Sequence, residues 1–149
     1  EVNLFHRIPE RIERVCRYLE GAGATDVLGR EQDARLEGIA SDRASCSAEG
    51  IGRADVVLIP LEDGDRAAAL AAAGKTVLAI DLNPLSRTAV AASVAVVDEL
   101  TRAVPNIMRH VEDLRNRPEE RRRLISEFSN DRNLERMRDA MCETLHQKG

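Results

Sequence analysis

Short apolar runs alternate with polar segments along the first hundred residues, and this pattern predicts an α/β fold. The clearest runs cover residues 54–60, 76–82 and 94–98, and they are rich in valine, isoleucine, leucine and alanine. Continuous apolar runs, as opposed to alternating ones, are typical of parallel strands buried on both faces. Segments 64–73 and 86–92 separate the runs, and we expect them to form the helices that connect the parallel strands.

The flanking segments predict further elements. Apolar positions at helical spacing indicate a helix over residues 9–20, with a strand before it at 2–5 and a short strand after it at 26–29. Residues 30–53 carry scattered charges and predict a long connection, with a short strand near 44–47. Amphipathic spacing after the last strand predicts three C-terminal helices, at residues 100–115, 118–128 and 134–147.

Two polar loops, 61–66 and 81–88, each follow one of the predicted strands. Since the strands are expected to be parallel, both loops should leave the same carboxyl edge of the sheet. Open α/β sheets bind their ligands at this edge. We therefore predict one crevice there, in which carboxylates, an amide, a hydroxyl and two arginines meet.

The first loop places Glu62, Asp63, Asp65 and Arg66 around a glycine. Its carboxylates could hold Mg²⁺, which usually takes one or two protein carboxylates together with substrate phosphates. They could equally orient an amine or a ribose. The simpler alternative is that Asp63 or Asp65 only caps the helix that follows.

The second loop begins with Asp81, and a carboxylate at a strand end can bind ribose hydroxyls in doubly wound folds. Asn83 could contact an adenine edge or a phosphate, and Arg87 could pair with phosphate. Ser86 or Thr88 could donate a hydrogen bond at the helix N-terminus. The alternative is an Asn-Pro turn followed by a serine N-cap.

Composition narrows the function classes. A net charge of −4 and an aromatic content of 2% disfavour nucleic-acid binding, which needs basic surfaces and stacking platforms. Arginine supplies 20 of the 22 basic residues and suits bidentate contact with phosphate or carboxylate. The three cysteines lack metal-ligand spacing, and no apolar stretch is long enough to span a membrane. We expect a reduced, cytoplasmic protein without a membrane partner.

Several unbroken blocks resemble the archaeal 4-phosphopantoate:beta-alanine ligases, also called phosphopantothenate synthetases, of coenzyme A biosynthesis. The blocks are Val2-Asn3-Leu4-Phe5-His6-Arg7 with Glu10-Arg11, residues 54–66, residues 81–88 and residues 97–103. The resemblance extends from Glu1 to about Phe128. It implies an α/β, Rossmann-like, mostly parallel sheet flanked by helices, with a nucleotide-binding domain over 1–115 and C-terminal helices over 116–149.

The same resemblance implies a homodimeric, AMP-forming ligase that uses ATP and Mg²⁺ to join 4-phosphopantoate to beta-alanine through an acyl-adenylate. It assigns the ATP site to seven residues: Asp81, Leu82, Asn83, Arg87, Thr88, Glu99 and Leu100. The resemblance assigns Asp63, Asp65 and Arg66 to contacts with substrate, Mg²⁺ or ATP. It assigns no residue as a ligand of a resident metal.

The chain begins at Glu1 without methionine, and family members carry about a hundred further residues before this point. We therefore expect this chain by itself to fold as one wall of the site with little ligase activity. The alternative function is a non-catalytic Rossmann-type domain for nucleotide binding or dimerisation. A response-regulator-like signalling domain ranks lower, because the lysine expected after the last strand is missing.

Overall fold

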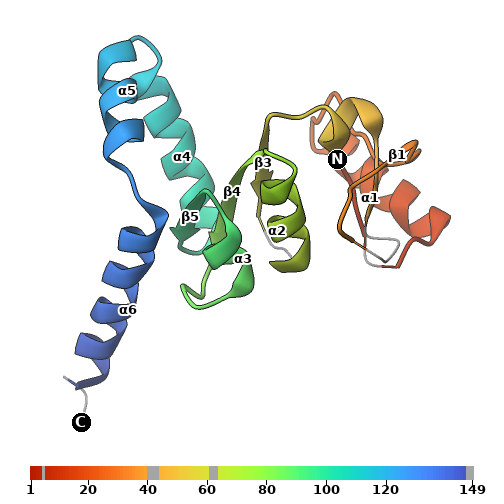
Figure 1. The fold of residues 1–149 in the computed structure, drawn as a ribbon. Coiled ribbons are helices and arrows are strands. Elements are labelled where there is room, and N and C mark those ends of the chain that lie inside the picture. The colour runs from red at the N-terminus through yellow and green to blue at the C-terminus, as the bar shows by residue number, and fades with distance from the viewer. Residues whose placement is uncertain (5, 40–43, 61–63, 147–149) are drawn as a thin grey trace.

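A computed structural model describes residues 1–4, 6–39, 44–60 and 64–146. Its centre is a parallel sheet in which β3 (Val56–Ile59), β4 (Thr76–Asp81) and β5 (Val94–Val97) lie side by side in that order. The crossover helices are α2 (Gly64–Ala72) and α3 (Arg87–Ala91) (Figure 1). The α/β class and the parallel sheet predicted from the apolar runs are therefore confirmed.

The main core lies between α2 and one face of this sheet. Leu70 and Ala67 of α2 are buried against Ile59, Val77 and Ala79 of the strands. Small alanine side chains let a helix and a sheet approach closely, and this core is built from aliphatic side chains and Cys46 without an aromatic ring among its buried residues. This packing fixes where α2 begins, at the carboxyl edge of the sheet.

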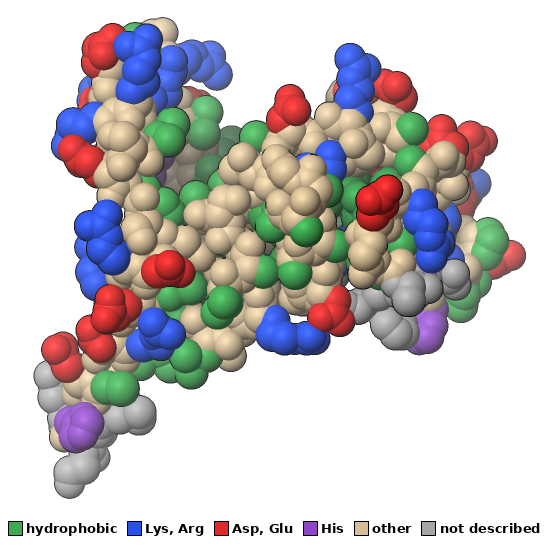
Figure 2. Space-filling model, viewed as in Figure 1, with side chains coloured by type: hydrophobic (Ala, Val, Ile, Leu, Met, Phe, Trp, Pro, Cys, Tyr) green, Lys and Arg blue, Asp and Glu red, His purple; other side chains and the backbone are tan. Residues whose placement is uncertain are grey.

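Three helices follow the sheet, namely α4 (Leu100–Leu114), α5 (Pro118–Glu127) and α6 (Asn130–His146). Helices α4 and α5 form an arm, and α6 runs from the sheet to the C-terminal end (Figure 1). In Figure 2 charged side chains cover the outer surface of α5 and α6, while hydrophobic side chains gather in the hollow between the arm and the sheet. None of the helices in the described residues is long and apolar enough to cross a membrane.

Helix α6 begins four residues earlier than its apolar spacing predicts, at Asn130 instead of Leu134. The Asn130 side chain donates from Nδ2 to the carbonyls of Ala89 and Ala92, at 3.0 Å each, and accepts from the amide of Ala95 at 2.8 Å. These hydrogen bonds stabilise the first turn of α6. The turn contributes no apolar residue to the helical pattern, so the pattern does not predict it.

The N-terminal region differs from the expected pair of strands at 2–5 and 26–29. Helix α1 (Pro9–Gly21) is present as predicted, but residues 2–4 and 26–29 form no strand. The two segments do lie together, because the Val2 amide donates to the Leu28 carbonyl at 2.7 Å. A Cβ on Gly29, whose φ is +111°, would lie 2.1 Å from the Val2 carbonyl oxygen, so only glycine permits this close approach.

Within the predicted long connection, β1 (Ala34–Arg35) pairs antiparallel with β2 (Ser45–Cys46). A short helical segment with a kink at Gly50, η2 (Ala48–Gly52), follows them. The strand expected near 44–47 is thus confirmed as β2, whereas β1 and η2 were not predicted. With two and five residues, β1 and η2 are too short to show a periodic pattern of apolar positions.

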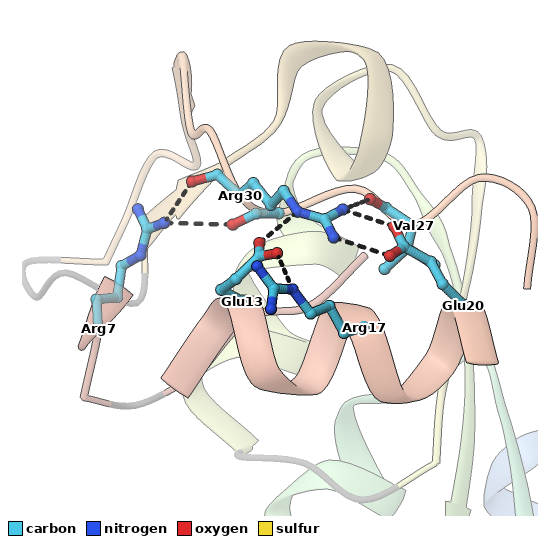
Figure 3. Close-up of polar contacts among 7 residues, drawn as sticks. Arg7, Glu13, Arg17, Glu20, Val27 and Arg30 are labelled. Atoms are coloured by element: carbon cyan, nitrogen blue, oxygen red, sulfur yellow. Dashed lines mark hydrogen bonds and ion pairs between the residues drawn. The ribbon is translucent and has the colours of Figure 1, made fainter. Parts of the chain in front are cut away.

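Arg30 joins this connection to α1 (Figure 3). Its guanidinium donates to Glu20 through two nitrogens, at 2.8 and 3.0 Å, and to Glu13 at 2.7 Å. The hydrogen bonds from Arg30 lower the pKa of both carboxyls. Arg7 donates to the carbonyls of Gly29 and Arg30, so the side chains of both Arg7 and Arg30 hold the start of the connection.

Candidate functional site

The three strands bring their carboxyl ends to one edge of the sheet. In the register of the sheet, Ile59 lies opposite Ala79 and Asp81 lies opposite Val97. The segments that begin at Pro60, Leu82 and Asp98 therefore leave the same edge. This confirms that the loops after β3 and β4 leave the same edge of the sheet, although Leu61, Glu62 and Asp63 lie outside the described residues. The crevice between the two loops stays a prediction.

Asp81 organises the loop that follows β4. Its Oδ1 accepts from the Asn83 amide at 2.9 Å, and its Oδ2 accepts from the Ser86 hydroxyl at 2.5 Å. Ser86 Oγ in turn accepts from the Ala89 amide at 3.0 Å and caps α3. The serine N-cap anticipated as the structural alternative is thus present. A carboxylate has about four lone-pair sites, so Asp81 keeps the capacity to accept from a ligand hydroxyl as well.

The first turns of α2 and α3 meet beside this loop. Arg87 Nη1 donates to Asp65 Oδ1 at 2.5 Å, and both side chains remain largely exposed. Gly64 makes the meeting possible, because a Cβ there would lie 2.3 Å from the Arg87 Cβ. Sequence reasoning missed this role of Gly64, and the only signal was a glycine among acidic residues just before a helix.

Arg66 and Thr88 lie one residue further into the same two helices, and both are buried, at 4% and 3% exposure. Burial raises the pKa of the Cys46 thiol in β2, and the positive charge of Arg66 partly opposes this rise. Both residues thus lie in the interior of the fold, whereas Asp65 and Arg87, their neighbours in sequence, remain exposed.

Glu99 and Leu100 lie at the start of α4, directly beyond β5. Glu99 Oε1 accepts from the Thr101 amide at 3.1 Å and so caps the helix, and the Thr101 hydroxyl bond lowers the pKa of the Glu99 carboxyl. Asp98 accepts a hydrogen bond from Arg102, which lowers the pKa of its carboxyl too. These acids keep their negative charge at neutral pH.

The edge thus combines the exposed Arg87 guanidinium, which is paired with Asp65, the Asp81 carboxylate and the N-terminus of α2. At the N-terminus of α4 the carboxylates of Asp98 and Glu99 offset the positive end of the helix dipole. Helix N-termini and arginine are the usual partners of phosphate groups. Asp65 has an exposed carboxylate that could contact Mg²⁺ held mainly by phosphates. No group of three or more His, Cys, Asp or Glu side chains in the described part could hold a metal without such a ligand.

Comparison with known proteins identifies the relatives of the chain. The family model described as phosphopantothenate/pantothenate synthetase matches residues 1–144. The 4-phosphopantoate–beta-alanine ligase of Methanosarcina mazei is 48% identical over 135 residues, covering 90% of this chain and 53% of that protein. The ligase of the same name from Methanospirillum hungatei is 52% identical over 114 residues, covering 76% of this chain and 46% of that protein.

A more distant ligase of the same name, from Thermococcus kodakarensis, is 38% identical over 136 residues, with 90% of this chain and 52% of that protein covered. The chain spans about half the length of the curated relatives it matches. The family match nevertheless covers almost all of the chain, including the described elements from α1 to α5 and most of α6. This chain belongs to the phosphopantothenate/pantothenate synthetase family.

Proposed function

We propose that this chain supplies the nucleotide-binding part of an ATP-dependent ligase that joins 4-phosphopantoate to beta-alanine in coenzyme A biosynthesis. The observation that carries the proposal is the carboxyl edge, where Asp81 and the Asp65–Arg87 pair lie beside helix N-termini. Relatives that share this part of the chain are named 4-phosphopantoate–beta-alanine ligases.

The chemistry of the edge suits adenylation of a carboxylate. Negative charge that develops on the transferred phosphate and on pyrophosphate is stabilised by fixed positive groups, which Arg87 and the N-terminus of α2 offer. Mg²⁺ would add charge neutralisation on the phosphates, with Asp65 within reach of such a metal. Asp81 would hold the ribose. The side chains at the edge would orient the reactants and stabilise the negative charge that develops, and the reaction needs no protein nucleophile.

Calorimetric titration of ATP tests the site assignment. We expect Asp81→Ala and Arg87→Ala each to weaken ATP binding by about tenfold or more, because each removes a charge-assisted contact. Arg53→Ala is the matched control, since Arg53 forms an exposed ion pair with Glu49 away from this edge. Unchanged affinity in both site variants would refute the assignment.

The reaction itself is tested by AMP release. The relatives are about twice as long as this chain, and we propose that activity requires the remaining part of such a protein. Supplied with ATP, Mg²⁺, 4-phosphopantoate and beta-alanine, the chain alone should form almost no AMP, whereas a protein of the relatives' length should form AMP in a beta-alanine-dependent manner. AMP formation by neither protein, together with intact ATP binding, would favour the non-catalytic nucleotide-binding function.

We also propose that the protein acts as a homodimer through α4. Val104, Met108 and Val111 repeat at helical spacing on α4, and all three are exposed. An apolar stripe of this kind on a charged helix is typical of a protein–protein contact. Met108→Glu should shift the protein toward the monomer in light scattering, and an unchanged mass would contradict this interface.

A further inference from the structure

The sheet is protected along one outer strand, β5, by side chains of α6. The Ala95 amide donates to Asn130 Oδ1 at 2.8 Å, and the Ala95 carbonyl accepts from Asn133 Nδ2 at 2.9 Å. The two asparagines thus satisfy backbone groups of β5 that a further strand would otherwise bind. Closing an edge in this way prevents unwanted pairing with another strand.

The opposite outer strand, β3, pairs only with β4 in the described part of the chain. The Thr76 amide donates to the Asp55 carbonyl at 2.8 Å, so alternate residues from Asp55 onward turn their backbone groups toward β4. The backbone groups of Val56 and Leu58 therefore point to the free edge. Among the described residues, no hydrogen bond to these groups closes the edge as the asparagines do at β5.

The same two residues leave apolar surface uncovered. Successive side chains of a strand point to opposite faces, and Val57 and Ile59 face the core under α2. Val56 and Leu58 face the other way and are 55% and 47% exposed. Natural edge strands are commonly blunted by charged side chains, internal prolines or bulges, and β3 has none of these. It has the composition of an inner strand in an outer position.

The relatives of the chain offer a source for the missing neighbour, because this chain spans only about half their length. We propose that an apolar strand from the other half of such a protein pairs with the free edge of β3, which becomes an inner strand of a larger sheet. Backbone hydrogen bonds would hold the added strand, and its aliphatic side chains would cover Val56 and Leu58. Since β3 leads into α2, this docking would place the other half beside Asp65 and Arg87.

Amide hydrogen exchange, measured residue by residue, tests the pairing in two proteins. One is this chain, and the other, the joined protein, links it to the part of the Methanosarcina mazei ligase that has no counterpart here. We expect the Val56 and Leu58 amides to exchange rapidly in the chain alone and at least about tenfold more slowly in the joined protein, because exchange then requires local opening. The Ala95 amide, already bonded to Asn130, is the matched control and should be protected in both.

A substitution separates strand pairing from a general gain in stability. Leu58→Lys changes a half-exposed position in the chain alone, so the urea midpoint there should stay near that of the wild type. In the joined protein the same lysine would be buried without a partner, and the midpoint should fall, because burying an unpaired charge is costly. Ile125→Lys is the matched control on α5, which lies away from β3 (Figure 1), and it should lower neither midpoint.

Two results would overturn the proposal. One is rapid exchange of the Val56 and Leu58 amides in the joined protein while the Ala95 amide is protected. The other is slow exchange in the chain alone, which would show that the chain itself, or a second copy if the effect depends on concentration, already closes the edge. If the joined protein does not fold, exchange at the two aligned positions of the intact Methanosarcina mazei ligase decides in the same way.

The proposal goes beyond the nucleotide function and does not depend on it. ATP enters none of these measurements, so their failure would leave the proposed function standing. Conversely, absence of ATP binding in calorimetry would overturn the proposed function and leave the pairing of β3 untouched.

Discussion

Asn130 is expected to be the main polar anchor of the C-terminal helix, and its removal should lower the stability of the domain measurably. The side chain joins α6 to both α3 and β5 through three hydrogen bonds of 2.8 to 3.0 Å. All three partners are backbone groups of a partly buried region. Asn130→Ala leaves the Ala95 amide and the carbonyls of Ala89 and Ala92 without this partner.

The size of the effect follows from these bonds. Each contributes a net of about 0.5–1.5 kcal/mol, so the loss of three predicts a decrease of about 2–4 kcal/mol in the free energy of unfolding. For a chain of this length, 1 kcal/mol corresponds to roughly 2–4 °C in Tm. Urea unfolding followed by far-ultraviolet circular dichroism gives the free energy directly.

Two further variants sharpen the assay. Asn130→Asp retains the acceptor for the Ala95 amide but removes the two donated bonds and brings a carboxylate against two carbonyl oxygens, so it should also destabilise the domain. Asn106→Ala is the control, because Asn106 accepts a single bond from the exposed Arg109 within α4. The reasoning would be refuted if Asn130→Ala lay within about 0.5 kcal/mol of Asn106→Ala, the usual range for surface substitutions.

Two other predictions concern packing and pH. Gly64→Ala should destabilise the domain by about 1–3 kcal/mol through overpacking and should also weaken ATP binding, because the new methyl group displaces Arg87. Gly21→Ala is the control, because open space surrounds Gly21, and it should not destabilise the domain. Equal stability of the two variants in urea would contradict this account. Arg30→Met should lower stability at neutral pH, because Arg30 lowers the folded-state pKa of Glu20 below its ordinary value of 4.5. That contribution is present above this value and disappears as the pH falls through the folded-state pKa, so the gap between variant and wild type should close in acid; a constant gap would argue against the ion pair.

The sequence by itself determined the sheet and its crossovers. Residues 54–60, 76–82 and 94–98 are apolar without alternation, as in strands covered on both faces, and the structure places β3, β4 and β5 within them. Burial on both faces is not confirmed for β3, because Val56 and Leu58 are 55% and 47% exposed. Parallel strands send their loops to one edge by geometry alone. For that reason the sequence alone assigns Asp81 and Asp65 to a shared edge, and both loops belong to the blocks that carry the family resemblance.

Tertiary structure alone decided which groups meet at that edge. The contact of Arg87 with Asp65 depends on the missing Cβ of Gly64, and the burial of Arg66 depends on how α2 packs; neither leaves a periodic signal in the sequence. The same holds for the start of α6, which Asn130 fixes through hydrogen bonds to distant backbone groups. Hydrophobic spacing reports which face of an element is buried, whereas contacts between elements depend on distances that only the folded chain defines.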